Sequence, residues 1–166
     1  MIETRIVSRT AFEVIGKSTW ISGQDNAQFA RFWAACGEDG TMGQLAQITG
    51  MRAGLQTGGS VMGVSCVEKD PSNRAFYFMV GVEKPADCDD LLETHAVPAC
   101  DWAVFSGRGE MPGALIEAEM YAFGEWLPSS GYEHALAPEI KVYLPDEVVA
   151  ETGVICEFWL PIRPAG

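Results

Sequence analysis

Two stretches open the two halves of this sequence in the same way: FEVIG at residues 12–16 and WAVFS at residues 102–106. Both combine β-branched and aromatic residues in a pattern that favours a β-strand. Each is followed by one segment with helical spacing of apolar residues and then by two further strand-like segments. The sequence therefore predicts the same β-α-β-β unit twice, over about residues 1–83 and about residues 92–166.

The closing strands of the two halves match as well. The first half closes on MGV at 62–64 and FYFMVG at 76–81, and the second closes on KVY at 141–143 and CEFWLP at 156–161. Matching residues lie about 80 positions apart in these strands and about 90 apart in the opening strands. Because neither half could bury its sheet alone, we predict one α+β domain over residues 1–166. The seam between the two copies, whose antiparallel sheets carry helices on one face, is the expected place for a central ligand cleft.

Two segments have helical spacing. Residues 26–36 carry an apolar face ending in Gly37, with Asp25 or Asn26 as the N-cap, and residues 113–127 carry an apolar stripe ending before Pro128. The apolar positions are Phe29, Phe32, Trp33 and Cys36 in the first segment and Ile116, Met120, Phe123 and Leu127 in the second. We expect most of the first set to fill the core, while Trp33 and Trp126 are placed to reach the cleft.

The rest of the chain is mostly extended. Residues 2–18 predict one long strand or two short ones, and 39–59 form a Gly-rich segment with a short helical turn over 42–48. The other expected strands are 61–67 and 75–82, joined by a polar hairpin, then 93–105, 138–144 and 153–162.

Composition excludes several classes of function. The 166 residues are 48% hydrophobic and carry a formal net charge of −12, without a run of basic residues. A surface that binds nucleic acid directly needs clustered Lys and Arg, so we do not expect one. The first residues begin a strand, not a secretion signal, and no apolar run is long enough to cross a bilayer. We therefore expect a cytoplasmic protein without a membrane partner, and its oligomeric state is left open.

The cysteines and histidines do not predict a metal site or a cofactor. Five cysteines occur, none spaced as C-x-x-C, and only His95 and His134 could join them as imidazole ligands. Cys36, Cys66 and Cys156 lie in apolar stretches, as expected for small buried side chains in a reducing compartment.

The alternation of side chains along the closing strands predicts a ligand-binding face. Ile140, Val142 and Leu144 form one side of their strand, which we take as the core face, and larger or charged residues form the other. The residues predicted to face the cleft, on the side away from the helices, are Tyr77, Met79, Glu139, Lys141, Tyr143, Glu157 and Trp159, with Trp126 reaching it from a helix.

Aromatic rings and carboxylates suit a flat, lipophilic, cationic ligand. Rings offer apolar area and π-faces, worth roughly 0.5–2 kcal/mol each toward a cation, and a carboxylate supplies the counter-charge. The alternative is that these side chains form ordinary cross-strand pairs on a solvated face, with Lys141 neutralising Glu139 or Glu157.

The sequence resembles the GyrI-like small-molecule-binding domain, the effector-binding domain of AraC-type and multidrug-sensing transcription regulators. The resemblance covers nearly the whole chain. The segments that carry it, in order, are MGV at 62–64, FYFMVGVE at 76–83, VPA at 97–99 with WAVFSG at 102–107, WLPSSGY at 126–132, PEIKVYLP at 138–145 and FWLPI at 158–162.

The resemblance implies a pseudo-twofold pair of β-α-β-β units whose cleft takes bulky amphipathic compounds, often cationic, with aromatic walls and a central glutamate. That glutamate stands two positions before the tyrosine in the family pattern P-E-x-E-x-Y, where this sequence has Lys141. An ammonium at that position repels a cationic ligand unless it is itself paired. Glu139 and Glu157 are the expected substitutes.

Three functions remain open at this stage. The first is a stand-alone protein that senses or sequesters a hydrophobic compound, since the chain lacks a basic helix-turn-helix segment. The second, which the resemblance implies, is a hydrolase of cyclopropane-bearing genotoxins, with Glu157 or Glu139 as base and Tyr143 as hydrogen-bond donor. The third is an acidic interaction module of the gyrase-inhibitor type.

Overall fold

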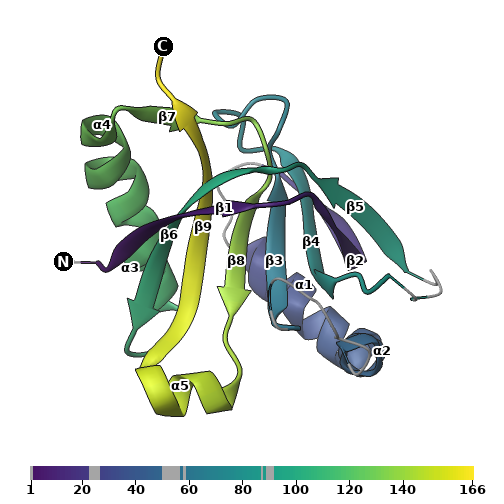
Figure 1. The fold of residues 1–166 in the computed structure, drawn as a ribbon. Helices are drawn as coiled ribbons and strands as arrows, with labels where there is room; N and C mark the ends of the chain where they lie inside the picture. Colours follow the sequence, from purple (N-terminus) through teal and green to yellow (C-terminus); the bar gives the residue numbers. More distant parts are fainter. Residues whose placement is uncertain (1, 23–26, 50–56, 58, 87, 89–91) are drawn as a thin grey trace.

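The computed structural model describes residues 2–22, 27–49, 57, 59–86, 88 and 92–166. In this described part of the chain, nine strands form one antiparallel sheet (Figure 1). They are β1 (Thr4–Arg9), β2 (Phe12–Ile21), β3 (Val61–Cys66), β4 (Phe76–Glu83), β5 (Glu93–Val97), β6 (Cys100–Arg108), β7 (Tyr132–His134), β8 (Glu139–Tyr143) and β9 (Val154–Pro164). The helices are α1 (Ala27–Glu38), α2 (Thr41–Thr49), α3 (Gly113–Tyr121), α4 (Leu127–Ser130) and α5 (Asp146–Thr152), and a π-helical turn, Ala122–Trp126, joins α3 to α4. The predicted α+β class is confirmed.

The strand order places the corresponding strands of the two halves symmetrically about the centre of the sheet. The sheet runs β1-β6-β9-β8-β3-β4-β2-β5, with β7 beside β9. The second half supplies β6-β9-β8 and the first half supplies β3-β4-β2, so the halves meet where β8 pairs with β3. Gly63 pairs with Lys141 at the middle of this seam.

The hydrogen-bonded registers repeat from one half to the other. Carrying residue 63 onto 141 and residue 81 onto 159, a shift of 78 positions, places the Met62–Gly81 pair on the Ile140–Trp159 pair. The opening strands β2 and β6 correspond in the same way when Gly16 is carried onto Val104. The alignment made from sequence alone was offset from this by two residues, which keeps the same side-chain face because strands have a period of two.

Each half gives its first strand to the other half. β1 pairs with β6, and β5 pairs with β2, so both edges of the sheet are exchanged. Residues 2–18 accordingly lie in two strands, β1 at one edge of the sheet and β2 next to the other edge strand, β5. Strand exchange has no local sequence pattern, because edge strands alternate in the same way whichever neighbour they pair with.

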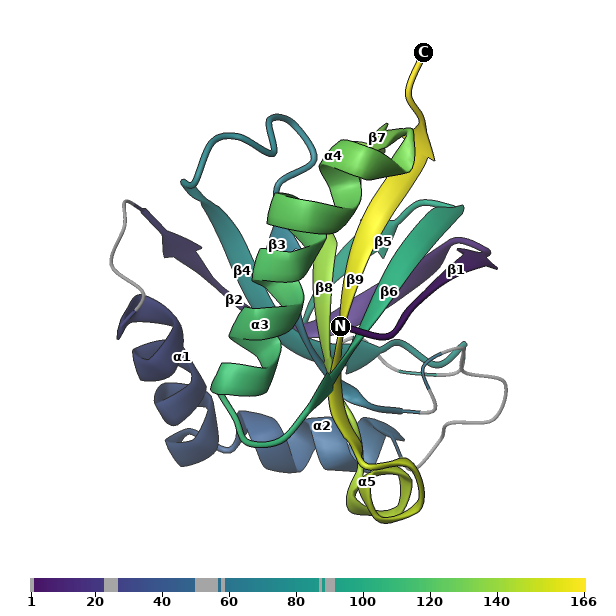
Figure 2. The ribbon, with the colours of Figure 1, turned by 90° about the vertical axis from the view of Figure 1, so that its left-hand side faces the viewer.

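The helices α1 to α4 lie on one face of the sheet, as predicted (Figure 2). Helices α1 and α2 pack on the first half through a cluster that includes Cys36, Leu45 and Phe78. Helix α3 packs on the second half through a cluster that includes Phe105 and Phe158. Within the described part of the chain, no helix has both the length and the apolar character that a membrane span requires.

The face that α3 presents to the sheet differs from the predicted stripe. Its buried residues are Ala114, Leu115 and Ala118, whereas Met120 is 69% exposed and Ile116 is also exposed. Small side chains let the helix approach the sheet closely, and its larger residues turn aside. The large apolar stripe in the sequence therefore does not mark the sheet-contacting face.

Glycines in the left-handed region end both predicted helices later than expected. Helix α1 continues to Glu38 and is followed by Gly40 at φ 89°, so Gly37 lies inside the helix. The second helical segment continues through Pro128 to Gly131 at φ 80°. Glycine adopts this conformation without the steric cost that a Cβ atom brings. The proposed N-caps Asp25 and Asn26 lie outside the described residues.

The opposite face of the sheet holds a second core. Strand β1 and the start of β6 pass in front of β8 and β3 in Figure 1. Side chains from seven strands meet in this core, which lies on the face away from the helices: Phe12, Val14, Met62, Val64, Met79, Val97, Trp102, Val104, Ile140, Val142 and Trp159. This face, where we predicted the ligand cleft, is thus filled by the protein's own side chains.

The Gly16–Gly81 pair gives a test of the register. A Cβ atom at Gly16 would lie 2.0 Å from the carbonyl oxygen of Val80, within the β2–β4 pairing. We expect Gly16→Ala to lower the free energy of unfolding by about 1–3 kcal/mol or more, as overpacking does. The matched control is Gly37→Ala, an exposed helical position with no atom within 4 Å of the added carbon, which we expect to be neutral or stabilising. Urea unfolding measures both, and equal effects would contradict the assigned pairing.

Candidate functional site

A cavity lies on the helix side of the sheet, between α1 and α3 and above β8, β3 and β4. Its volume is about 560 Å³, within the range of roughly 300–1,000 Å³ typical of small-molecule sites. The residues that line it are Ile21, Phe29, Ala30, Trp33, Ser65, Arg74, Phe76, Phe78, Met111, Pro112, Leu115, Ile116, Glu119, Met120, Glu139, Lys141 and Tyr143. The cavity lies here because α1 packs on β2 and α3 packs on β6 and β9, while residues of both helices line the space over β8 and β3.

Aromatic rings form the wall on the α1 side. The rings of Trp33 and Tyr143 meet edge to face at a centroid distance of 4.9 Å, and Phe29 meets Phe78 in the same way at 4.9 Å. Edge-to-face packing fixes the orientation of each ring and leaves other ring faces free to contact a ligand. On the α3 side, Ile116 and Met120 supply flexible apolar side chains, so the two walls together suit a bulky lipophilic guest.

Lys141 does not stand alone at the seam. Its Nζ lies 3.5 Å from a carboxylate oxygen of Glu119, on α3, and 4.8 Å from the ring centroid of Phe29. Removal from water raises the pKa of Glu119 above its usual value, and the Lys141 ammonium opposes that rise. The cavity therefore contains an ion pair whose carboxylate is partly removed from water.

A second carboxylate, Glu139, is 4% exposed and is held by two basic side chains. Its Oε2 lies 3.1 Å from Nε2 of His134, and its Oε1 lies 3.6 Å from the guanidinium of Arg74. The backbone N–H of Leu136 donates to Nδ1 of His134, so the ring proton sits on Nε2 and points at Glu139. These contacts fix the orientation of the Glu139 carboxylate at the cavity wall.

Tyr143 completes the row of β8 side chains that face the cavity. Burial raises the pKa of its phenol, with a further contribution from the charge of Glu119, so the hydroxyl stays protonated at neutral pH. It can therefore donate a hydrogen bond to a ligand. Glu139, Lys141 and Tyr143 alternate along one strand and share one face, as the sequence predicted.

Five of the predicted site residues lie away from this cavity. Tyr77 is 56% exposed and packs on Trp20 at 5.0 Å, and Met79 is buried in the core on the opposite face. Trp126 packs between Phe105 and Tyr132 rather than reaching the cleft. Trp33, the other tryptophan placed to reach it, does line the cavity.

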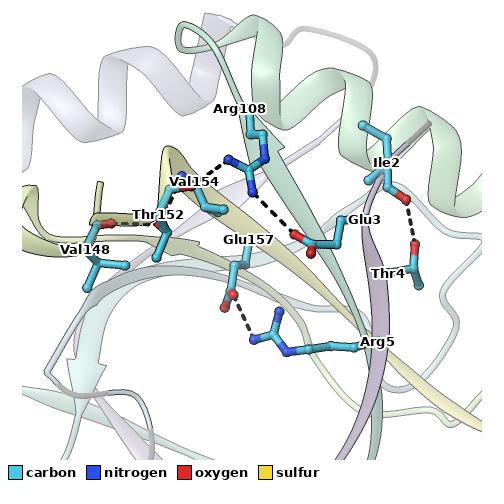
Figure 3. A network of polar contacts seen from close by, with 9 residues as sticks. All are labelled: Ile2, Glu3, Thr4, Arg5, Arg108, Val148, Thr152, Val154 and Glu157. Atoms are coloured by element: carbon cyan, nitrogen blue, oxygen red, sulfur yellow. Dashed lines mark hydrogen bonds and ion pairs between the residues drawn. The ribbon is translucent and has the colours of Figure 1, made fainter. Parts of the chain in front are cut away.

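Glu157 and Trp159 lie on the face away from the helices, as predicted, but the cavity is on the opposite face. The β8–β9 register pairs Val142 with Glu157 and Ile140 with Trp159, and directly paired residues share a face. Glu157 instead accepts hydrogen bonds from Arg5 at 2.9 Å and from the indole of Trp159 at 3.0 Å, and Figure 3 shows it directed at Arg5. The expectation that Glu157 and Tyr143 would act together is therefore wrong.

Three polar residues of the site were missed from the sequence. Glu119, Arg74 and His134 come from a helix, a turn and a short strand, and none of them was among the predicted site residues. Glu119 had one usable signal, because it lies three positions after Ile116 and so shares its helical face. Arg74 and His134 had none, since the β3–β4 turn and β7 reach Glu139 only through the tertiary fold.

Comparison with known proteins agrees with this architecture. The family model of the GyrI-like small molecule binding domain matches residues 2–163. SAV2435, whose structure was solved bound to tetraphenylphosphonium, is 18% identical and superimposes with a TM-score of 0.78 over 97% of this chain and 94% of its own. No curated protein matches this sequence.

Two further structures share the fold. A protein from Staphylococcus aureus MU50 named for bacterial transcription regulation is 18% identical, with a TM-score of 0.72 over 98% of this chain and 99% of its own. The C-terminal domain of EcmrR is 13% identical, with a TM-score of 0.61 over 99% of each chain. At these identities the structures establish the common fold, and the family match extends across nearly the whole sequence. The chain belongs to the family of GyrI-like small-molecule-binding domains.

Proposed function

We propose that this protein binds bulky hydrophobic compounds, organic cations among them, in the cavity between α1 and α3, and so senses or sequesters them. The observation that carries the proposal is the cavity of about 560 Å³ at the seam, which combines aromatic walls with a desolvated carboxylate. Tetraphenylphosphonium, bound by SAV2435, has the size and charge that such a cavity would accept.

The Lys141–Glu119 pair would set the selectivity for charge. A ligand cation that approaches Glu119 competes with Lys141, whose ammonium lies 3.5 Å from the carboxylate. The Lys141 ammonium can move away from the carboxylate toward solvent, because it is carried on a flexible four-carbon side chain. A neutral aromatic ligand would leave the pair intact and use the rings alone.

Binding is supported better than hydrolysis. The hydrolase hypothesis needs a carboxylate free to activate water beside Tyr143. Glu139 faces the cavity but is engaged by His134 and Arg74, and Glu157 lies on the other face of the sheet. Glu119 is engaged by Lys141, so each carboxylate that lines the cavity has a basic partner.

The role of the aromatic wall in binding can be tested by comparing alanine substitutions at two tryptophans, one that lines the cavity and one outside it. We expect Trp33→Ala to weaken tetraphenylphosphonium binding about tenfold, the equivalent of about 1.4 kcal/mol, because the ring contributes both apolar area and a π-face. Trp20→Ala is the matched control, since Trp20 is outside the cavity and half exposed. Isothermal titration calorimetry measures both variants, with thermal unfolding to verify that each is folded. Equal affinities in wild type and Trp33→Ala would contradict the proposed site.

Removing the charge of Lys141 or of Glu119 should change the affinity for a cationic ligand but not for a neutral one. We expect Lys141→Met to raise affinity for tetraphenylphosphonium, and Glu119→Gln to lower it, each by about tenfold or more because the groups interact at low effective dielectric. Triphenylphosphine oxide, a neutral aromatic probe, should bind both variants within about threefold of wild type. A parallel change for the two probes would show that the variants alter the shape of the cavity and not its charge.

Affinity for the cation should rise with pH. Burial raises the pKa of Glu119 above its usual value of 4.5, so at low pH the carboxyl is neutral and attracts a cation weakly. As pH rises through that elevated pKa the carboxylate forms, and affinity increases by up to about tenfold per pH unit before levelling off. Glu119→Gln should remove this pH-dependent component. An unchanged pH profile in that variant would assign it to another group.

A further inference from the structure

A separate group of side chains converges on the face of the sheet away from the helices. Cys66 ends β3, Glu68 lies in the turn that follows, and His95 is in the middle of β5. The thiol sulfur, a carboxylate oxygen and an imidazole nitrogen all lie within 4.8 Å of one another. His95 Nε2 is 2.6 Å from Glu68 Oε2, and these two side chains are 32% and 29% exposed. An ion could therefore reach the group from solvent.

The curvature of the sheet brings these residues together from distant positions. Cys66 shares its face with Met62 and Val64 in the core away from the helices, and His95 pairs with Val14 of the same core. β5 belongs to the second half of the chain and β3 to the first, so the cluster bridges the two halves through the exchanged edge strand.

The fold does not require a polar cluster at this place. The pseudo-twofold relation carries Cys66 onto Leu144, and His95 corresponds to Val7. Leu144 and Val7 are apolar and pack against the same core. The same position in the duplicated scaffold is thus filled by aliphatic side chains in one copy and by a thiol and an imidazole in the other, which points to a chemical role for the second set.

The three donors match a zinc-type ion. Thiolate sulfur, imidazole nitrogen and carboxylate oxygen are the ligands that Zn²⁺ uses, and sites with three protein ligands complete a tetrahedron with water. Bond lengths of about 2.0–2.3 Å place ligand atoms about 3.3–3.8 Å apart, a small adjustment from the arrangement observed.

We propose that Cys66, Glu68 and His95 bind one divalent metal ion of the zinc class and leave one coordination position to water. The ion would tie β5 to the β3–β4 turn, and so tie the second half of the chain to the first. The site contains no C-x-x-C motif, because its second ligand, two positions after Cys66, is Glu68 and the third ligand, His95, comes from a distant strand. The spacing of the cysteines therefore did not predict it.

Cobalt titration of the full chain under reducing conditions tests the site. We expect one equivalent of Co²⁺ to give a sulfur-to-cobalt charge-transfer band and the intense visible bands of tetrahedral cobalt, and Zn²⁺ to displace it. Cys66→Ser should abolish the charge-transfer band. His95→Gln should weaken binding by more than the roughly 10–100-fold that changes around a metal's ligands cost. Cys100→Ser is the matched control, a partly buried thiol outside the cluster that should leave the spectrum unchanged.

Wild-type protein that shows no charge-transfer band would overturn the proposal, as would a band that persists in both Cys66→Ser and His95→Gln. Circular dichroism shows whether each variant is folded. If Cys66→Ser does not fold, the result for His95→Gln alone tests the proposal. The outcome is independent of the proposed ligand site, because the cluster and the cavity lie on opposite faces of the sheet.

Discussion

The pairing of β3 with β8 is the constraint on which the rest of the structure depends. It joins the two halves through backbone hydrogen bonds at the Gly63–Lys141 register and continues one sheet across both. Each half carries its helix over its own strands, so the central pair receives no helix of its own. The side chains of β8 that face the helices therefore become the floor of a cavity and not part of a packed core.

The cavity also depends on how α3 contacts the sheet. Alanine residues bring the helix backbone close to β6 and β9, so Ile116, Glu119 and Met120 are free to face the seam. In this way one helix buries its small side chains for stability and turns its larger ones toward a guest. Lys141 and Glu119 then neutralise each other across the opening, which lowers the cost of keeping two charges partly out of water.

Local patterns were enough to predict the duplication, the main helices and strands, and the row formed by Glu139, Lys141 and Tyr143, because each follows from side-chain periodicity. They could not show which sheet face the helices would leave open, since Glu157 and Trp159 alternate just as the cavity residues do. Register decided that question, and register is a property of strand pairing. The contacts of Arg74 and His134 with Glu139 likewise exist only after distant segments meet.

The exchange of edge strands links the two halves of the molecule. β1 lies beside β6, and β5 lies beside β2, so each repeat is completed by a strand that its own chain segment does not supply. A single repeat on its own would expose an unsatisfied sheet edge and would recover its partner strand only from another copy. One polypeptide thus contains the architecture of an intertwined pair, and the exchanged edge strands hold the two halves together in addition to the β3–β8 pairing.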